Sequence, residues 1–133
     1  MAKTWTWVLG VVLTIVGIWG YLTDGGLILG IFAVDGTHNL VHLVSGIVGI
    51  LAALGGEKYS KTYLQVFGVI YALVFILGLF GSGRVLNMFV TNMADNILHL
   101  VIAAVALYGG FGKGKGMGSM GGGMPMPPAP PAV

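Results

Sequence analysis

The chain has 133 residues, of which 56% are hydrophobic and 8% are charged, and its mean hydropathy is +0.95. So few charged side chains cannot cover the surface of a soluble domain of this length, and the composition therefore predicts a membrane protein. The basic residues are spread along the chain rather than gathered in a stripe, so nucleic acid is not an expected partner. Cysteine is absent, which excludes disulfides and thiolate chemistry.

Four apolar stretches follow one another along the chain. Each is close to the length of about 20 residues that a helix needs to cross the hydrocarbon layer, and none has a polar face. They are Trp5–Leu22, His38–Leu54, Tyr63–Phe80 and Asp95–Gly110. We therefore expect an all-α polytopic membrane protein whose four transmembrane helices form one domain over residues 1–111. The remainder, residues 112–133, is rich in Gly, Met and Pro and is expected to be a flexible tail.

The three connections between these stretches differ in length and polarity. Residues Gly55–Thr62 are short and polar, and we expect a simple turn there. Residues Thr23–Thr37 and Gly81–Ala94 are longer and half apolar. Such segments are expected to lie in the membrane interface or to fold back over the helix bundle, because their backbone groups must stay hydrogen-bonded.

The basic residues predict how the chain is oriented. Five of the six lie at the N-terminus, in the middle connection and in the tail, which four spans bring to one side of the membrane: Lys3, Lys58, Lys61, Lys113 and Lys115. Arg84 alone lies on the other side. The positive-inside rule then predicts a multi-pass protein of the cell membrane with both termini in the cytoplasm.

An internal repeat links the two halves of the chain. Residues 26–44 (GLILGIFAVDGTHNLVHLV) align with residues 83–101 (GRVLNMFVTNMADNILHLV) at a spacing of 57, with seven identical positions. The first and third stretches also match, with a spacing of 58, at Gly10/Gly68 and Gly20/Gly78. The pattern predicts two tandem helical hairpins, about residues 5–55 and 62–110, related by a pseudo-two-fold axis along the membrane normal.

The repeat also pairs the polar residues. Asp35 and Asn92 occupy equivalent positions and are expected to be helix N-caps. The identical polar pairs that follow them are Asn39/Asn96 and His42/His99. Asn and His three residues apart share one side of a helix. Each His lies about 10 Å along its helix at 1.5 Å per residue, in the outer part of the hydrocarbon layer.

The polar motifs resemble those of a known family. The segments DGTHNLVHLVSG and ADNILHLV, together with the four spans, are similar to small bacterial membrane proteins grouped as domain-of-unknown-function family 4383. The resemblance covers about residues 5–110 and leaves out the tail. It implies a four-span bacterial membrane protein and no established activity.

Ionisable side chains within a membrane indicate a functional site, and three interpretations remain open for these. In the first, Asn39, His42, Asn96 and His99 form a polar network that holds the helices together. In the second, His42 and His99 bind a haem b iron from both sides, or they share a metal ion with other groups. The further metal ligands in that case would be His38 and Asp95, which are themselves equivalent positions. In the third, the histidines belong to a small proton or solute channel.

The sequence contains no catalytic triad, carboxylate pair or phosphate loop, so we do not expect an enzyme. A structural or assembly role in the membrane is expected instead, with lipid and further copies of the chain as partners. The prediction of a homo-oligomer rests on Gly and Ala faces, which allow close helix packing. The glycines concerned are Gly10, Gly17, Gly20, Gly68 and Gly78.

Overall fold

The computed structural model describes residues 1–23 and 26–113, and this part of the chain is built on four long helices. They are α1 (Ala2–Leu22), α2 (Gly36–Gly55), α3 (Glu57–Phe80) and α4 (Met93–Phe111). All four are long and apolar enough to cross a membrane, which confirms the predicted all-α class. Outward-facing side chains such as Leu51 and Phe80 are apolar, as a lipid environment requires. The predicted flexible tail lies, from residue 114 onward, outside the described residues.

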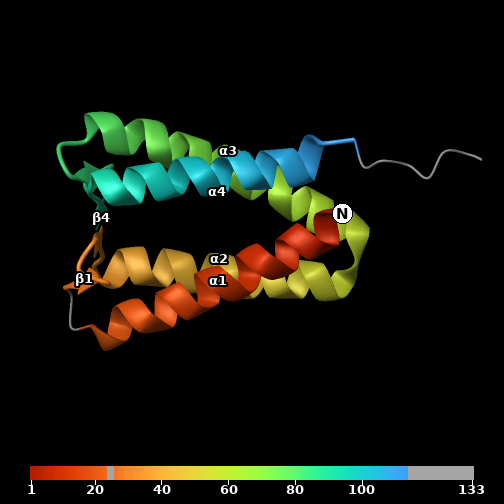
Figure 1. Ribbon diagram of the computed structural model, residues 1–133, viewed down its shortest axis with the longest axis horizontal. Helices are drawn as coiled ribbons and strands as arrows, with labels where there is room; N and C mark the ends of the chain where they lie inside the picture. Colours follow the sequence, from red (N-terminus) through yellow and green to blue (C-terminus); the bar gives the residue numbers. More distant parts are fainter. Residues whose placement is uncertain (24–25, 114–133) are drawn as a thin grey trace, which may run out of the picture.

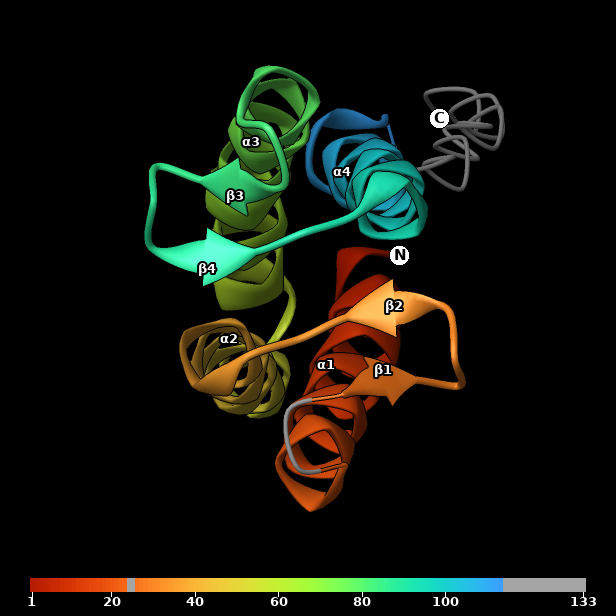
Figure 2. The ribbon, with the colours of Figure 1, turned by 90° about the vertical axis from the view of Figure 1, so that its left-hand side faces the viewer.

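Two short β-hairpins form the long connections and cover one end of the bundle (Figures 1 and 2). They pair β1 (Leu27–Ile28) with β2 (Phe32–Ala33), and β3 (Arg84–Val85) with β4 (Phe89–Val90), in both cases antiparallel. The equivalent residues Leu29 and Leu86 have positive φ values of 55° and 47°. The sequence predicted segments at the interface or over the bundle, and hairpins satisfy their backbone groups there.

The connection between α2 and α3 is shorter than the sequence predicted. The expected polar turn over Gly55–Thr62 is wrong, because Gly56 alone separates the two helices, with a φ of 107° that favours glycine. The polar residues form the first turns of α3 instead. The Glu57 carboxylate accepts backbone hydrogen bonds from Ala2 (2.8 Å) and Lys3 (3.0 Å), and it therefore caps the start of α1.

Glycines bring the helices close together inside one molecule. A Cβ atom on Gly17 of α1 would lie 2.9 Å from the Cβ atom of Leu43 in α2, and one on Gly68 of α3 would lie 2.9 Å from Leu107 of α4. The other glycines that suggested self-association also face their own helices: Gly10 faces α2, Gly20 faces Asn39, and Gly78 faces Asn96. Self-association remains a prediction, but these faces no longer support it.

The two halves have the same order of elements, a helix followed by a hairpin and a second helix. α1 packs mainly against α2, and α3 against α4. Seen from the hairpin end, the two hairpins extend in opposite directions, as a half-turn about the bundle axis would place them (Figure 2). This arrangement is the one expected of a tandem repeat, whose origin by duplication stays a prediction.

Candidate metal centre

Three histidines meet inside the hairpin end of the bundle. His38 and His42 lie one turn apart on α2, and His99 lies on α4. The Asp35 side chain accepts a hydrogen bond from the His38 backbone N–H (2.8 Å), so it caps α2 and fixes where the helix begins. The ring centroids are 4.5 Å apart for His38 and His42, 5.6 Å for His38 and His99, and 6.3 Å for His42 and His99. The cap and the helix period thus bring the three rings together.

These imidazoles are buried and carry unpaired nitrogens. Their exposed fractions are 0% for His38, 3% for His42 and 2% for His99. Within the described part of the chain, both ring nitrogens of His38, both of His42 and Nδ1 of His99 have no hydrogen-bond partner. Leaving a buried polar group unpaired costs about 1–3 kcal/mol. A cluster of this kind is explained when a ligand uses the nitrogen lone pairs.

The spacing of the nitrogens suits a small ion. One ligand nitrogen from each of His38, His42 and His99 lies within 4.8 Å of the others. In a tetrahedral zinc site with Zn–N distances of about 2.1 Å, two ligand nitrogens are about 3.4 Å apart. Small side-chain rotations would close that difference. Imidazole is a ligand for Zn, Cu, Fe and Ni, so the donor set fits a transition metal.

Asp95 adds a carboxylate beside the cluster. It is equivalent to His38 in the repeat and is 2% exposed. Its Oδ2 atom accepts backbone hydrogen bonds from Asn92 (2.9 Å) and Ala33 (3.0 Å). Asp95 also lines a small cavity together with His42. The capping box and the hairpin therefore hold this carboxylate near the imidazoles, where it places a negative charge next to any bound cation.

Hydrogen bonds between the halves fix the two sides of the cluster. The Asp35 Oδ2 atom accepts from the backbone N–H of Val90 in the second hairpin (2.9 Å). Asn92 Nδ2 donates to the backbone carbonyl of Ile31 in the first hairpin (2.6 Å). The second helix of each half begins at an N-cap, Asp35 for α2 and Asn92 for α4. Each of these caps is thus hydrogen-bonded to the hairpin of the opposite half. These ties set the histidines of α2 and α4 across from each other.

Among the described residues, no hydrogen bond joins the asparagines of the predicted network to its histidines. The Asn39 side chain faces Gly20 of α1, and the Asn96 side chain faces Gly78 of α3. Among the described residues the Oδ1 atom of each asparagine has no hydrogen-bond partner. Three residues fall about 60° short of a full helical turn. The asparagines therefore turn toward the first helix of their own half, whereas His42 and His99 turn toward the opposite half.

His38 takes a larger part than the sequence suggested. The sequence singled out the repeated pair His42 and His99 and kept His38 only as a further ligand. The structure places all three in one cluster. The spacing of His38 and His42, four residues apart at the start of one helix, was the signal that could have shown this.

The predicted haem b between His42 and His99 does not fit. The His38 ring lies 4.5 Å from the His42 ring and 5.6 Å from the His99 ring, centroid to centroid, so it occupies the space that the porphyrin would need. The cavity that His42 lines has a volume of about 90 Å³, much smaller than a porphyrin ring. A small ion meets these limits and a macrocycle does not.

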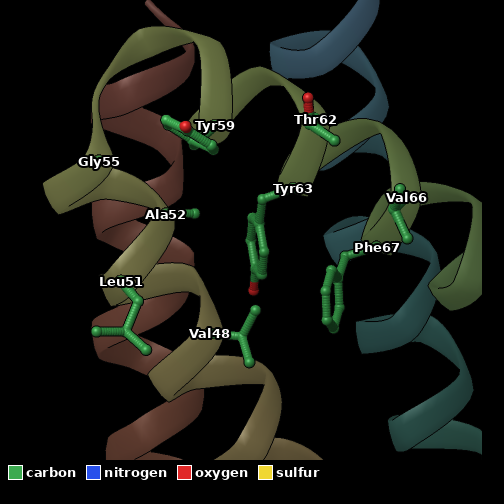
Figure 3. A pocket seen from close by; sticks show the side chains of 9 residues that line it. All are labelled: Val48, Leu51, Ala52, Gly55, Tyr59, Thr62, Tyr63, Val66 and Phe67. Atoms are coloured by element: carbon green, nitrogen blue, oxygen red, sulfur yellow. The ribbon is translucent and has the colours of Figure 1, made fainter.

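A larger groove of about 500 Å³ lies between α2 and α3 toward the Gly56 turn (Figure 3). Its walls are almost wholly apolar, and Tyr63 and Phe67 stack in it with their ring centroids 4.4 Å apart. The Tyr63 hydroxyl is engaged, because it donates to the backbone carbonyl of Ser45 (2.9 Å). The groove is not lined by histidine, so it lacks the imidazole ligands that the predicted haem b would use.

Two of the polar residues deeper in the spans are engaged by backbone carbonyls. Thr14 donates to the carbonyl of Gly10 in its own helix (2.7 Å). Gln65 donates to the carbonyl of Gly110 in α4 (2.9 Å). Both side chains are used in packing, so the predicted channel gains no support from them.

Four span-length helices with a buried cluster of three histidines define a small multi-pass membrane protein with a candidate metal centre. A family model described as Domain of unknown function (DUF4383) matches residues 3–112. The chain belongs to this family, which confirms the membership that its motifs suggested. No curated protein and no solved structure gave a significant match.

Proposed function

We propose that this protein binds one transition-metal ion inside the membrane through His38, His42 and His99. The observation that carries the proposal is the convergence of three buried imidazoles, with ligand nitrogens within 4.8 Å of one another. A metal ion would take one nitrogen lone pair from each ring, so it would engage one of the two unpaired nitrogens of His38 and of His42. The proposal thus accounts for the convergence and for part of the unpaired nitrogens.

The chemistry of the site favours copper or zinc. Three neutral imidazoles suit these metals, and hard ions such as Mg²⁺ or Ca²⁺ prefer oxygen ligands. An ion in a low-dielectric interior also needs a compensating charge nearby. Asp95 supplies one negative charge beside the cluster, and Asp35, the N-cap next to His38, supplies a second one nearby. One carboxylate balances Cu(I), and the two together balance Cu(II) or Zn(II).

We further propose that the site lies in the outer half of the cell membrane. Lys3, Lys58 and Lys61 lie at the end of the bundle opposite the two hairpins (Figure 1). The positive-inside rule assigns that end, and with it both termini, to the cytoplasm. The metal would then be exchanged on the external side. Fusion of a reporter to either terminus, active only in the cytoplasm, tests this orientation.

The test of metal binding uses the full-length protein purified in mild detergent. We expect one equivalent of Cu(I) or Zn(II) per chain by titration and elemental analysis, and an X-ray absorption spectrum with imidazole nitrogens as ligands. The double variant His42→Ala/His99→Ala should lose the ion. Asn39→Ala, a change at a buried polar residue on the same helix, is the matched control and should keep it. Absence of binding in the unmodified protein, or equal binding by the double variant, would refute the proposal.

Binding should weaken at acidic pH. Metal ions bind the deprotonated nitrogen, so protons compete for the same lone pairs. We expect the apparent affinity to fall once the pH is low enough to protonate the imidazoles, and to recover when the pH is restored. A metal ion that stays bound after the imidazoles are protonated would indicate that His38, His42 and His99 are not the ligands.

A further inference from the structure

The small cavity beside the histidines lies under the first hairpin. It has a volume of about 90 Å³ and is enclosed by α1, the hairpin, α2 and α4. Its lining is almost wholly apolar, although His42 and Asp95 take part in it. Two other lining residues, Trp19 and Leu29, are 41% and 63% exposed. The cavity thus lies between a histidine of the cluster and side chains that reach the surface.

The equivalent place in the other half is filled. There the Phe89 ring packs on the His38 ring with centroids 5.0 Å apart, and Phe89 is 6% exposed. In the first half the equivalent residues are Phe32 and Asp95. The shorter Asp95 side chain gives the Phe32 ring no imidazole to cover, and Phe32 stays only half-buried. The second hairpin has the same fold, but its Phe89 ring covers His38. The hairpin fold therefore does not by itself require a cavity at this place.

Three protein ligands leave a metal ion with an unused position. Metal sites that act on small molecules have three protein ligands and an open fourth position, whereas closed structural sites have four. Here three histidines converge and Asp95 is held by backbone N–H groups of Ala33 and Asn92. Because His42 is shared by the cluster and the cavity, the unused position has this cavity beside it.

We propose that the bound ion takes a small uncharged molecule from this cavity as its fourth ligand. The inference rests on the proposed metal binding. The volume of about 90 Å³ admits a molecule of only a few non-hydrogen atoms. The apolar lining favours an uncharged molecule over an anion. Such molecules also dissolve in lipid and are therefore available to a cavity inside the membrane.

Carbon monoxide on the Cu(I)-loaded protein is the probe, because it is small, uncharged and binds Cu(I) with an open position. We expect one infrared C–O stretching band from a bound molecule. Val16→Phe places a ring into the cavity and should weaken carbon monoxide binding at least about tenfold, equivalent to 1.4 kcal/mol. Val74→Phe, the change at the equivalent position of α3, should leave the band and the affinity as they are.

Leu98→Phe on α4 is a second cavity-filling change, with Val41→Phe at the equivalent position of α2 as its control. Copper affinity is measured for every variant, so that loss of the metal is not mistaken for loss of its ligand. Failure of the unmodified protein to bind copper would refute the proposed function. Bound copper without a carbon monoxide band, or a band that both cavity-filling variants retain unchanged, would overturn this inference alone.

Discussion

The two halves of the molecule share one plan and differ where the candidate site is built. Each half consists of a first membrane-length helix, a β-hairpin and a second helix that begins at a polar N-cap. Equivalent positions hold His42 and His99, which face each other across the bundle. At the neighbouring equivalent positions, however, one half has His38 and the other has Asp95. The shared residues are a symmetric pair of proposed ligands, and the difference adds a third proposed ligand on one side and a carboxylate on the other.

This comparison separates what the hairpin fold needs from what the site needs. Both halves form the same turn, with positive φ values at Leu29 and Leu86, so the hairpins tolerate different neighbours. The fold that the two halves share does not require a buried histidine at position 38 or a buried carboxylate at the equivalent position 95. Substitutions at equivalent positions therefore make matched tests, in which each half serves as the control for the other.

The largest effect is expected at the position where the halves differ most. His38→Leu removes a proposed ligand and should lower metal affinity by at least about 100-fold, whereas Asp95→Asn removes only a nearby charge and should lower it about tenfold. Asn keeps a side-chain oxygen that can accept from Ala33 and Asn92. Competition titration against a chelator measures both affinities. Equal losses would show that Asp95 binds the metal directly and that the two positions do not differ in role.

A smaller effect is expected from the helix contacts, where Gly46 in α2 is equivalent to Ala103 in α4. A Cβ atom on Gly46 would lie 2.8 Å from the Gly10 carbonyl oxygen and would also meet Thr14 of α1. Gly46→Ala should therefore destabilise the fold by about 2 kcal/mol through overpacking. Ala103→Gly should cost about 1 kcal/mol, because it loses helix propensity without a clash. Reversible unfolding in mixed micelles measures both. A neutral Gly46→Ala would mean that α1 and α2 do not approach this closely.

An effect no larger than this is expected at the caps. Asp35 caps α2 and also accepts from Val90, so Asp35→Ala should cost about 2 kcal/mol. Asp35→Ser keeps a capping oxygen and should recover about 1 kcal/mol of this loss. Asn92 caps α4 and also donates to Ile31, so Asn92→Ala should likewise cost about 2 kcal/mol. The same unfolding assay applies. If Asp35→Ser were as unstable as Asp35→Ala, the bond between the halves would outweigh the cap.

Much of the architecture could be predicted from the sequence, because its signals are local. The length and apolar character of each span follow from the requirement that a helix in lipid satisfies its own backbone. The N-cap residues Asp35 and Asn92 are recognisable because a polar side chain must pair the first backbone N–H groups. The extent of α3 was misjudged, since polar residues at Glu57–Thr62 suggested a turn. In the structure these residues continue the helix beyond its apolar part.

The arrangement of the polar side chains depended on contacts between distant residues. The sequence identified Asn39, His42, Asn96 and His99 as one group, but the asparagines face glycines of the first helix in each half. The glycines that were expected to contact a second copy of the chain instead face neighbouring helices of their own chain. The helical period shows which residues share one face of a helix. Which neighbouring helix that face contacts depends on how the four helices cross.

By itself, the sequence determined that this chain forms four membrane-length helices in two similar halves, with its histidines near the end that the two long connections cover. Periodicity, capping and the cost of unpaired backbone in lipid are sufficient for that. Only the tertiary structure decided that His38 joins His42 and His99, and that a cavity lined by His42 lies under the first hairpin. Those features arise because histidines of α2 and α4 meet in the interior of the bundle and because each helix cap bonds to the opposite hairpin, none of which is encoded in any single segment.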